Sequence, residues 1–305
     1  MKKNFLLHML VVVALSSVVF VGCKDDDDSD GGGQSTPVAS ASYFGDKDNE
    51  RQLTSVGNWS FGFNDDDILS KITYTGTYST SGSYTIKTKD TPYTIVYYSG
   101  SYSRYANYVY YTDFRFSSSG YITSLKVSTY NQSSKPDEDD EADETENWSF
   151  SYNGDGQMTS ASMTYSESSE SSKESGSESA TIEYDEGDIA SMKVSTSYEG
   201  ESTKVDVSYK DEVYYSKSTS SKEEWEYTFE TSTKNQYGQN VQELPNFSLP
   251  MFSFFGPLGW YGKGSAHFIS SANSRSRGSY SYSTINTDSY GFVSKYNGNT
   301  YKYSY

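Results

Sequence analysis

The chain has 305 residues, a formal net charge of −17, 31 tyrosines, one cysteine and two histidines. Such an acidic chain repels nucleic acid and anionic lipid surfaces, because phosphate groups carry the same sign of charge. One cysteine excludes an intramolecular disulfide. His267 is the one histidine after residue 22, so a multi-histidine metal site is excluded as well, and we expect no metal and no cofactor.

Residues 1–22 are predicted to be an export signal. Lys2 and Lys3 form its basic start, and the apolar stretch that follows is too short for a comfortable membrane span of about 20 residues. Its end, Phe-Val-Gly-Cys23, resembles a bacterial lipobox, which implies that Cys23 is lipidated and becomes the new N-terminus. The alternative is an ordinary signal peptide with a chance cysteine. Cleavage removes both lysines and leaves 22 basic against 41 acidic residues, a net charge of −19.

Residues 23–42 are predicted to contain the acylated cysteine, an export signal and a flexible tether. The run Lys24, Asp25, Asp26, Asp27 and Asp28 resembles the surface-export signal of Bacteroidota lipoproteins, and the alternative is a solvated acidic spacer. The Gly- and Ser-containing stretch 31–37 is typical of a tether. These features predict an outer-membrane lipoprotein of a Gram-negative bacterium. It would be surface-exposed and would contact the membrane through its N-terminal lipid only.

Residues 43–305 are predicted to form a single antiparallel β domain. Apolar and polar residues alternate with a period of two at 71–78, 204–209, 224–230 and 301–305. This pattern is typical of half-buried antiparallel strands, whereas no stretch shows a long helical stripe. At a spacing of about 8–12 residues the domain would contain about 14–20 strands.

An internal repeat supports this prediction. A polar turn is followed by Gly, any residue, an aliphatic residue and then Ser or Thr in SSSGYITSLKV at 117–127. The same frame fits 153–163, 185–194 and 287–296, and with Asp67 or Arg51 in the glycine place it fits 64–72 and 49–56. Gly, Asn and Asp tolerate the positive φ that such turns need. Each unit is therefore expected to be a β-hairpin that stacks on its neighbours.

The repeat resembles the tyrosine-aspartate hairpin repeats of bacterial surface proteins. The whole layout of 43–305 is similar to a family of uncharacterised Bacteroidota lipoproteins described as having a porin-like fold. The resemblance implies architecture and no activity. Because an open sheet of so many strands leaves edges, we expect meandering antiparallel hairpins in a large barrel or a strongly curled sheet.

Two polar segments, 135–146 and 166–179, are predicted to be hairpin tips because neither can bury apolar area. Clustered carboxylates at 135–146 or at 64–67 could bind a cation, but both lack the glycine-turned pattern of a calcium loop. We therefore expect no specific metal site.

The segment 243–264 holds three of the six prolines of the chain together with six large aromatic residues. One interpretation is a plug or short helix near 248–256, because prolines exclude a central strand. The other is an exposed aromatic platform on which Trp260 and Tyr261 stack against sugar rings, with Lys263 or His267 at its rim.

The tyrosine-rich stretch 93–116 is the second candidate site. Its consecutive pairs Tyr97–Tyr98 and Tyr110–Tyr111 place rings on both faces of a strand. These rings could contact a ligand, and the alternative is cross-strand aromatic pairing.

The features together predict a lipid-anchored cell-surface binding or adhesion module whose partner is a glycan or an envelope protein. The first alternative is a structural scaffold or subunit of an outer-membrane envelope complex. The second is a glycoside hydrolase, which needs only two carboxylates. We expect no catalysis, because the sequence holds no GxSxG, no HExxH and no phosphate-binding glycine loop.

Overall fold

The computed structural model describes a large part of the chain after residue 42. The described residues are 43–44, 51–65, 69–74, 81–87, 94–100, 107–132, 134–137, 139–168, 173–198, 201–210, 213–218, 224–242, 244, 247–274, 278–281 and 285–304. The predicted signal peptide, Cys23, the acidic run 24–28 and the tether lie outside them. Contacts divide the chain into two units, Met1–Ser35 and Thr36–Tyr305, and every described residue belongs to the second.

The repeated polar turn has a glycine in the left-handed region of backbone conformation at four places, and only at Gly187 does the residue before the glycine also have a positive φ. Its glycine has a φ between +78° and +91° at Gly120, Gly156, Gly187 and Gly291. At three of these places the glycine N–H donates to the backbone carbonyl of the residue three positions earlier, at 3.0–3.1 Å. The aliphatic residue two after the glycine is then buried in every case, namely Ile122, Met158, Ile189 and Val293. The sequence prediction of hairpins that enter the core after the glycine is therefore confirmed.

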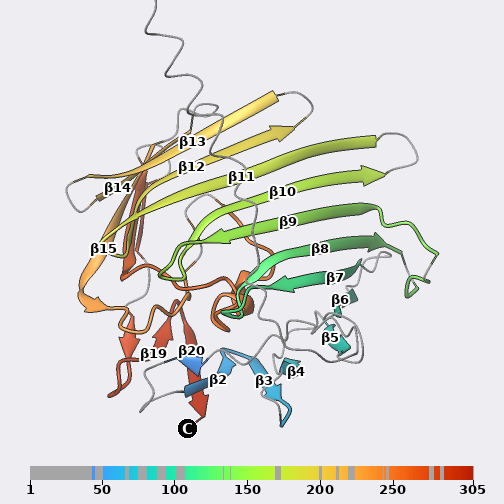
Figure 1. Cartoon of the computed structure of the whole chain (residues 1–305), viewed down its shortest axis with the longest axis horizontal. Helices are drawn as coiled ribbons and strands as arrows, with labels where there is room; N and C mark the ends of the chain where they lie inside the picture. The colour runs from blue at the N-terminus through green and yellow to red at the C-terminus, as the bar shows by residue number, and fades with distance from the viewer. Residues whose placement is uncertain are drawn as a thin grey trace, which may run out of the picture. The chain divides into compact units, whose positions relative to one another are not determined.

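A sheet of 13 strands among the described residues follows the chain in order. Each strand pairs antiparallel with its neighbours in the sequence, except that the two end strands have one partner each, so the sheet is a meander. Figure 1 shows β7 to β13 side by side in this order. The strands are β5 (Ser81–Lys87), β6 (Thr94–Gly100), β7 (Asn107–Phe116), β8 (Ile122–Asn131), β9 (Glu144–Tyr152), β10 (Met158–Ser168), β11 (Lys173–Asp185), β12 (Asp188–Tyr198), β13 (Glu201–Lys210), β14 (Val213–Ser218), β15 (Glu224–Lys234), β16 (His267–Ser274) and β17 (Gly278–Ser281).

A second sheet joins the beginning of the body to its end. Its order is β18-β19-β20-β2-β3-β4, with β1 also paired to β2. The strands are β1 (Tyr43–Phe44), β2 (Arg51–Val56), β3 (Trp59–Phe63), β4 (Leu69–Tyr74), β18 (Asn286–Thr287), β19 (Val293–Tyr296) and β20 (Asn299–Ser304).

Taken together, the strands of the two sheets follow one another in the order of a closed ring that is interrupted at two places. The pairing of β2 with β20 joins the two ends of the order, and β4 contacts β5 without entering its sheet. No described residue pairs β4 with β5 or β17 with β18, so both sheets are open. The predicted fold class, all-β with meandering antiparallel hairpins in a large barrel or a strongly curled sheet, is confirmed, and of its two forms the closed barrel is not the one found among the described residues.

The two faces of the large sheet differ in chemistry. We call the face that packs on the core the inner face. Across β8 to β12 its register partners are Leu125 with Trp148, Phe150 with Ala161, and Ile182 with Met192, and all of these are buried. On the outer face, Ser, Thr and Asn are paired in the same way, and most of them are exposed: Asn147, Ser149, Ser151, Ser162, Thr164, Ser166, Ser175, Ser177, Ser179 and Thr181.

The segment 247–262 covers part of the inner face. Its single helical turn, α1 (Phe252–Phe255), lies within the range 248–256 predicted for a short helix or plug. Phe255 lies 5.8 Å from Phe114 and Trp260 lies 5.4 Å from Phe116, between ring centroids. Because these rings replace water over the apolar part of the sheet, the segment completes the core.

Two polar segments form strands for longer than the sequence predicts. Glu144 to Glu146 belong to β9 rather than to a loop, and the arms of the predicted tip 166–179 belong to β10 and β11 up to Ser168 and from Lys173. Backbone pairing with neighbouring strands explains this result, because it needs no apolar side chain. No helix among the described residues is long and apolar enough to cross a membrane.

Gly262 offers a test of the packing between segment 247–262 and the sheet. Its φ is +74°, and an added Cβ would lie 2.8 Å from the Tyr152 ring and closer still to the Gly156 carbonyl oxygen. We predict that Gly262→Ala lowers the free energy of unfolding by about 3 kcal/mol, from strain and overpacking together. Chemical denaturation followed by near-ultraviolet circular dichroism measures this loss.

Two other glycines are matched controls. Gly298 has a φ of +80° but no atom within 4 Å of the added Cβ, so Gly298→Ala should cost only the backbone term of about 1 kcal/mol. Gly154 also has open space around its Cβ, and Gly154→Ala should stay within about 0.5 kcal/mol of the parent protein. Equal losses at all three glycines would contradict the packing described for segment 247–262.

Candidate functional site

Three tyrosines share the outer face of β7 and β8. Tyr108 is the register partner of Tyr130, and Tyr110 lies two residues further along the same strand. Because side chains alternate along a strand, these three point to the outer face, and all are half-buried. We call Tyr108, Tyr110 and Tyr130 the tyrosine row.

The rings of the row are close to one another. Tyr110 and Tyr130 meet edge to face, with centroids 5.4 Å apart and an interplanar angle of 73°. Burial raises the pKa of Tyr110, and the nearby phenols of Tyr130 and Tyr108 raise it further. The Tyr110 hydroxyl therefore stays neutral at physiological pH. Tyrosine hydroxyls can both donate and accept hydrogen bonds.

Polar groups adjoin the row on the same face. Ser128 is the register partner of Tyr110, and it is paired in turn with Thr145 on β9. Lys126 and Asn147 form the next pair along these strands. Flat rings beside hydroxyl, amide and ammonium groups are what recognition of a sugar requires, since a pyranose has an apolar CH face and a polar edge.

The structure separates the four tyrosines predicted from 93–116. Tyr110 lies on the outer face, whereas Tyr111 is buried on the inner face with its ring 6.2 Å from Phe255. The side chains of Tyr97 and Tyr98 lie outside the described residues. Their backbones are in register with Val109 and Tyr108, which places position 98 next to the row.

The expectation that Trp260 and Tyr261 form an exposed platform is not met in this structure. Their exposed fractions are 1% and 0%. Tyr261 packs its ring 5.3 Å from Phe150, and its hydroxyl donates to the Pro250 carbonyl at 2.6 Å. The other interpretation of the segment, a buried plug, is the arrangement found, because aromatic residues far away in the sequence supply the partners.

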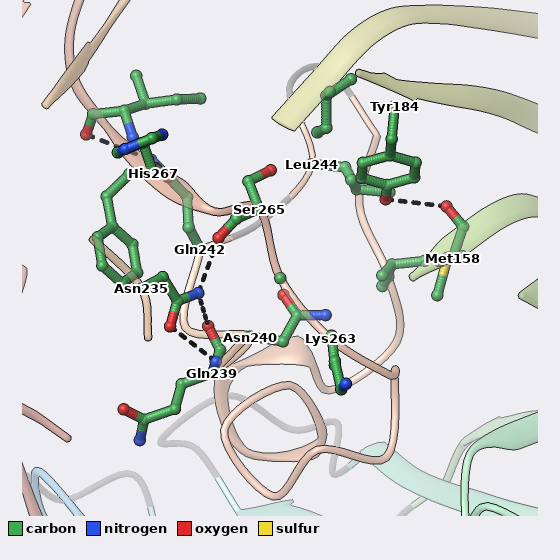
Figure 2. Close-up of a pocket in the computed structure, with 15 residues that line it drawn as sticks. Met158, Tyr184, Asn235, Gln239, Asn240, Gln242, Leu244, Lys263, Ser265 and His267 are labelled. Atoms are coloured by element: carbon green, nitrogen blue, oxygen red, sulfur yellow. Dashed lines mark hydrogen bonds between the residues drawn. The ribbon is translucent and has the colours of Figure 1, made fainter. Parts of the chain in front are cut away.

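The rim residues proposed for that platform line a small cavity instead. Figure 2 shows Lys263 and His267 around it with Asn235, Gln239 and Tyr184. Its volume is about 30 Å³, which is room for one or two water molecules and far below the roughly 300 Å³ of a ligand pocket. The cavity is therefore a water-sized space and not a sugar site.

Side-chain amides hold the walls of this cavity. Asn235 donates to the carbonyls of Gln239 and Ser265 at 3.0 and 2.8 Å and accepts the Gln239 N–H at 2.8 Å (Figure 2). Gln239 in turn accepts the Val293 N–H at 2.6 Å and donates to the Tyr303 hydroxyl. These hydrogen bonds join the loop after β15 to the second sheet. Both side chains are buried, so the bonds are shielded from water.

His267 contacts Asp188 through both its ring and its backbone. The Asp188 carboxylate lies 2.7 Å from His267 Nδ1 and also accepts the His267 backbone N–H at 2.8 Å. This double contact fixes the start of β16 against the turn before β12. No group of three or more His, Cys, Asp or Glu residues in the described part of the chain could hold a metal ion.

Partly buried glutamates lie on the inner face beyond the aromatic part of the core. Register and alternation place Glu144, Glu146 and Glu178 on the side of Trp148, and Trp148 Nε1 donates to Glu146 at 2.7 Å. Burial raises the pKa of Glu144, and the charges of Glu146 and Glu167 raise it further. Burial, followed by the charge of Glu146, also raises the pKa of Glu178. The general acid of a glycoside hydrolase is a carboxyl group with a raised pKa, which Glu144 and Glu178 have. The glycoside-hydrolase alternative therefore stays a prediction.

Sequence reasoning missed Tyr108 and Tyr130. The period-two spacing of Tyr108 and Tyr110 was a usable signal for the first of them. Tyr130 could not be assigned by counting from the turn, because a bulge at Asp113, with a φ of +54°, shifts the register between β7 and β8.

The glutamates of the inner face predict an unusual dependence of stability on pH. Because the folded-state pKa values of Glu144 and Glu178 are raised, each contributes stability in its protonated form. That contribution is present below the unfolded-state pKa and is lost as the pH rises through the folded-state pKa. We predict that Glu144→Gln and Glu178→Gln are more stable than the parent at pH 7 and that this gain shrinks as the pH falls towards 4.

Asp140 is the control of opposite sign, since the Asp137 N–H and the Gln132 amide lower its pKa. Asp140→Asn should not stabilise the protein at pH 7. Thermal unfolding between pH 4 and 8 measures all three variants, and glutamine variants that are less stable than the parent at pH 7 would contradict the burial described.

Comparison with known proteins found structural likeness only. No family model matches the chain, and no curated protein matches it. A porin-like protein from Bacteroides vulgatus aligns over 83% of this chain and 98% of its own, with 10% identity and a TM-score of 0.46. A porin-like protein from Bacteroides uniformis aligns over 68% of this chain and 93% of its own, with 12% identity and a TM-score of 0.33. Membership of a Bacteroidota family stays a prediction.

Proposed function

We propose that the chain is a lipid-anchored envelope protein whose β body binds neutral carbohydrate and catalyses no reaction. The observation that carries the proposal is the tyrosine row, three half-buried rings grouped on a face whose described residues on the neighbouring strands β9 to β11 are mostly polar. Tyrosines held by strands lose little conformational entropy when a ligand stacks on them. A sugar would place its CH face on the rings of Tyr110 and Tyr130. Its hydroxyls would reach Thr145, Lys126 and Asn147, since Ser128 is buried.

The polar outer face supports a body outside the bilayer. A lipid-facing strand needs outward apolar residues flanked by aromatic girdles. Most outer positions of β9 to β11 are Ser, Thr and Asn, and the Ser149 and Ser162 hydroxyls bond to each other at 2.7 Å. The proposed anchor is thus the lipid on Cys23, whose acyl methylenes contribute about 0.8 kcal/mol each to membrane binding.

The charge of the chain narrows the ligand class. A net charge of −19 after cleavage repels uronic-acid or sulfated polymers, since their charge has the same sign. This repulsion does not weaken the binding of neutral glycans. We therefore expect neutral polysaccharides to bind in preference to anionic ones, and added salt to leave binding to neutral glycans almost unchanged.

The proposed anchor predicts a change of cell fraction. The variant Cys23→Ala removes the thiol that would carry the lipid, so the protein should move from the membrane fraction to the soluble fraction and take up no labelled palmitate. Ser29→Ala, six residues further on, should stay membrane-bound. Cys23→Ala protein that still sediments with membranes would contradict the lipid anchor.

The proposed ligand contact predicts a loss of affinity. The protein without its lipid, from residue 23 and with Cys23→Ala, is screened on a broad glycan and polysaccharide array, and hits are measured by calorimetry. Changing Tyr108, Tyr110 and Tyr130 together to Ala should weaken binding of a neutral hit at least tenfold, about 1.4 kcal/mol.

The matched control for this loss is Thr164→Ala with Ser177→Ala on the same face, which should bind as the parent does. Circular dichroism and thermal unfolding show whether the triple variant folds. A triple variant that folds and binds as well as the parent, or an array with no neutral hit, would contradict the proposal.

A further inference from the structure

Tyr290 is the one large hydrophobic residue that is clearly exposed in the described part of the chain, with 46% of its surface exposed. It lies in the last of the repeated turns, between Asp288 and Gly291. In the other three turns with a glycine, the residue before that glycine is Ser119, Asp155 or Glu186. The turn is therefore formed without an aromatic residue at this position, and its geometry does not explain the ring.

The buried guanidinium group of Arg51 packs on one face of the Tyr290 ring. The Arg51 guanidinium carbon lies 3.9 Å from the ring centroid, and Arg51 is 5% exposed. Arg51 also bonds Asp288 at 3.2 Å and lies 5.1 Å from the Phe292 ring. A cation over the ring fixes the orientation of the ring, and the ion pair with Asp288 fixes the cation.

The backbone on either side of the ring is fixed as well. The second oxygen of Asp288 accepts the N–H groups of Tyr290 and Phe292 at 2.9 and 3.0 Å. The Tyr237 hydroxyl donates to the Tyr290 carbonyl at 3.0 Å, and the Tyr237 ring stacks on Phe292 at 4.4 Å. An aromatic residue held by so many contacts can receive a ligand at little further cost in entropy.

Polar groups suited to a sugar adjoin the ring. The Gln236 amide oxygen lies 2.6 Å from the position that a Cβ on Gly291 would take. The Gln236 amide nitrogen donates to the Tyr237 hydroxyl at 3.2 Å. Gln236 and Ser289 are exposed. An oriented ring with an amide and hydroxyls at its edge matches a pyranose, which stacks through its CH face and bonds through its hydroxyls.

We infer that Tyr290, supported by Arg51, is a second carbohydrate-stacking site of this protein, separate from the tyrosine row. The inference rests on the proposed function for its ligand class. The ligand is a neutral hexose, because Asp288 and the overall charge oppose an anionic one. Two stacking sites on one body would raise affinity for a long polymer over that for a short oligosaccharide, as expected for bivalent binding.

Saturation-transfer NMR and calorimetry with cellohexaose, laminarihexaose and maltohexaose test this site in the protein from residue 23 with Cys23→Ala. We expect Tyr290→Ala to weaken binding of the best of these probes at least fivefold. Tyr290→Phe keeps the ring and should bind within twofold of the parent, and Thr287→Ala, at an exposed position three residues before the ring, is the neighbouring control. Thermal unfolding shows whether each variant folds, and the Phe variant keeps the test valid if Tyr290→Ala is unstable.

The outcomes separate this site from the tyrosine row. Loss of binding in the triple variant of the row, with binding unchanged in Tyr290→Ala, would overturn the second site and leave the proposed function standing. Loss in Tyr290→Ala alone would support the second site and move the ligand contact away from the row. Equal binding by Tyr290→Ala and the parent, or no saturation transfer from any of the three probes, would overturn the inference.

Discussion

The packing of segment 247–262 on the inner face of the large sheet is the constraint on which the rest of the structure depends. Trp260 and Phe255 contact Phe114, and Tyr261 contacts Phe150, so rings from a coil segment complete a core that strands alone leave open. Where this segment covers the sheet, the protein's own aromatic side chains fill the face. A ligand there would have to displace them, at a cost of several kcal/mol. The part of the inner face that this segment covers is therefore closed to recognition, whereas the outer face and the turns are not covered by it.

A buried amide network connects this core to the second sheet. Asn235 and Gln239 bond the backbone where a strand partner would otherwise do so, and Gln239 reaches Val293 and Tyr303. Breaking one of these bonds would leave a polar group buried without a partner, which costs more than the bond is worth on average. Together with the pairing of β2 and β20, the network brings the first and last strands of the body into one sheet. The Arg51 to Asp288 contact beneath Tyr290 belongs to the same junction.

Local signals were sufficient to predict the hairpins, and long-range contacts explain where the prediction failed. Gly120 and Gly291 were read correctly, because a positive φ and the aliphatic residue that follows are properties of a few neighbouring residues. Trp260 was expected on the surface as one of two alternatives, yet its burial depends on Phe114 and Phe116, more than 140 residues earlier in the chain. Tyr130 was missed because the bulge at Asp113 changes the register. The glutamates of β9 were assigned to a loop, since their strand is formed by backbone pairing rather than by apolar residues.

Tyrosine-selective labelling can detect directly whether the outer tyrosine row contacts a neutral glycan. The protein is nitrated with and without a saturating neutral polysaccharide, and the modified tyrosines are identified by mass spectrometry. We predict that Tyr110 and Tyr130 are labelled in the free protein and protected in the complex, whereas the buried Tyr111 and Tyr261 stay unlabelled in both. Unchanged labelling of Tyr110 and Tyr130 in a saturated complex would contradict the proposed contact.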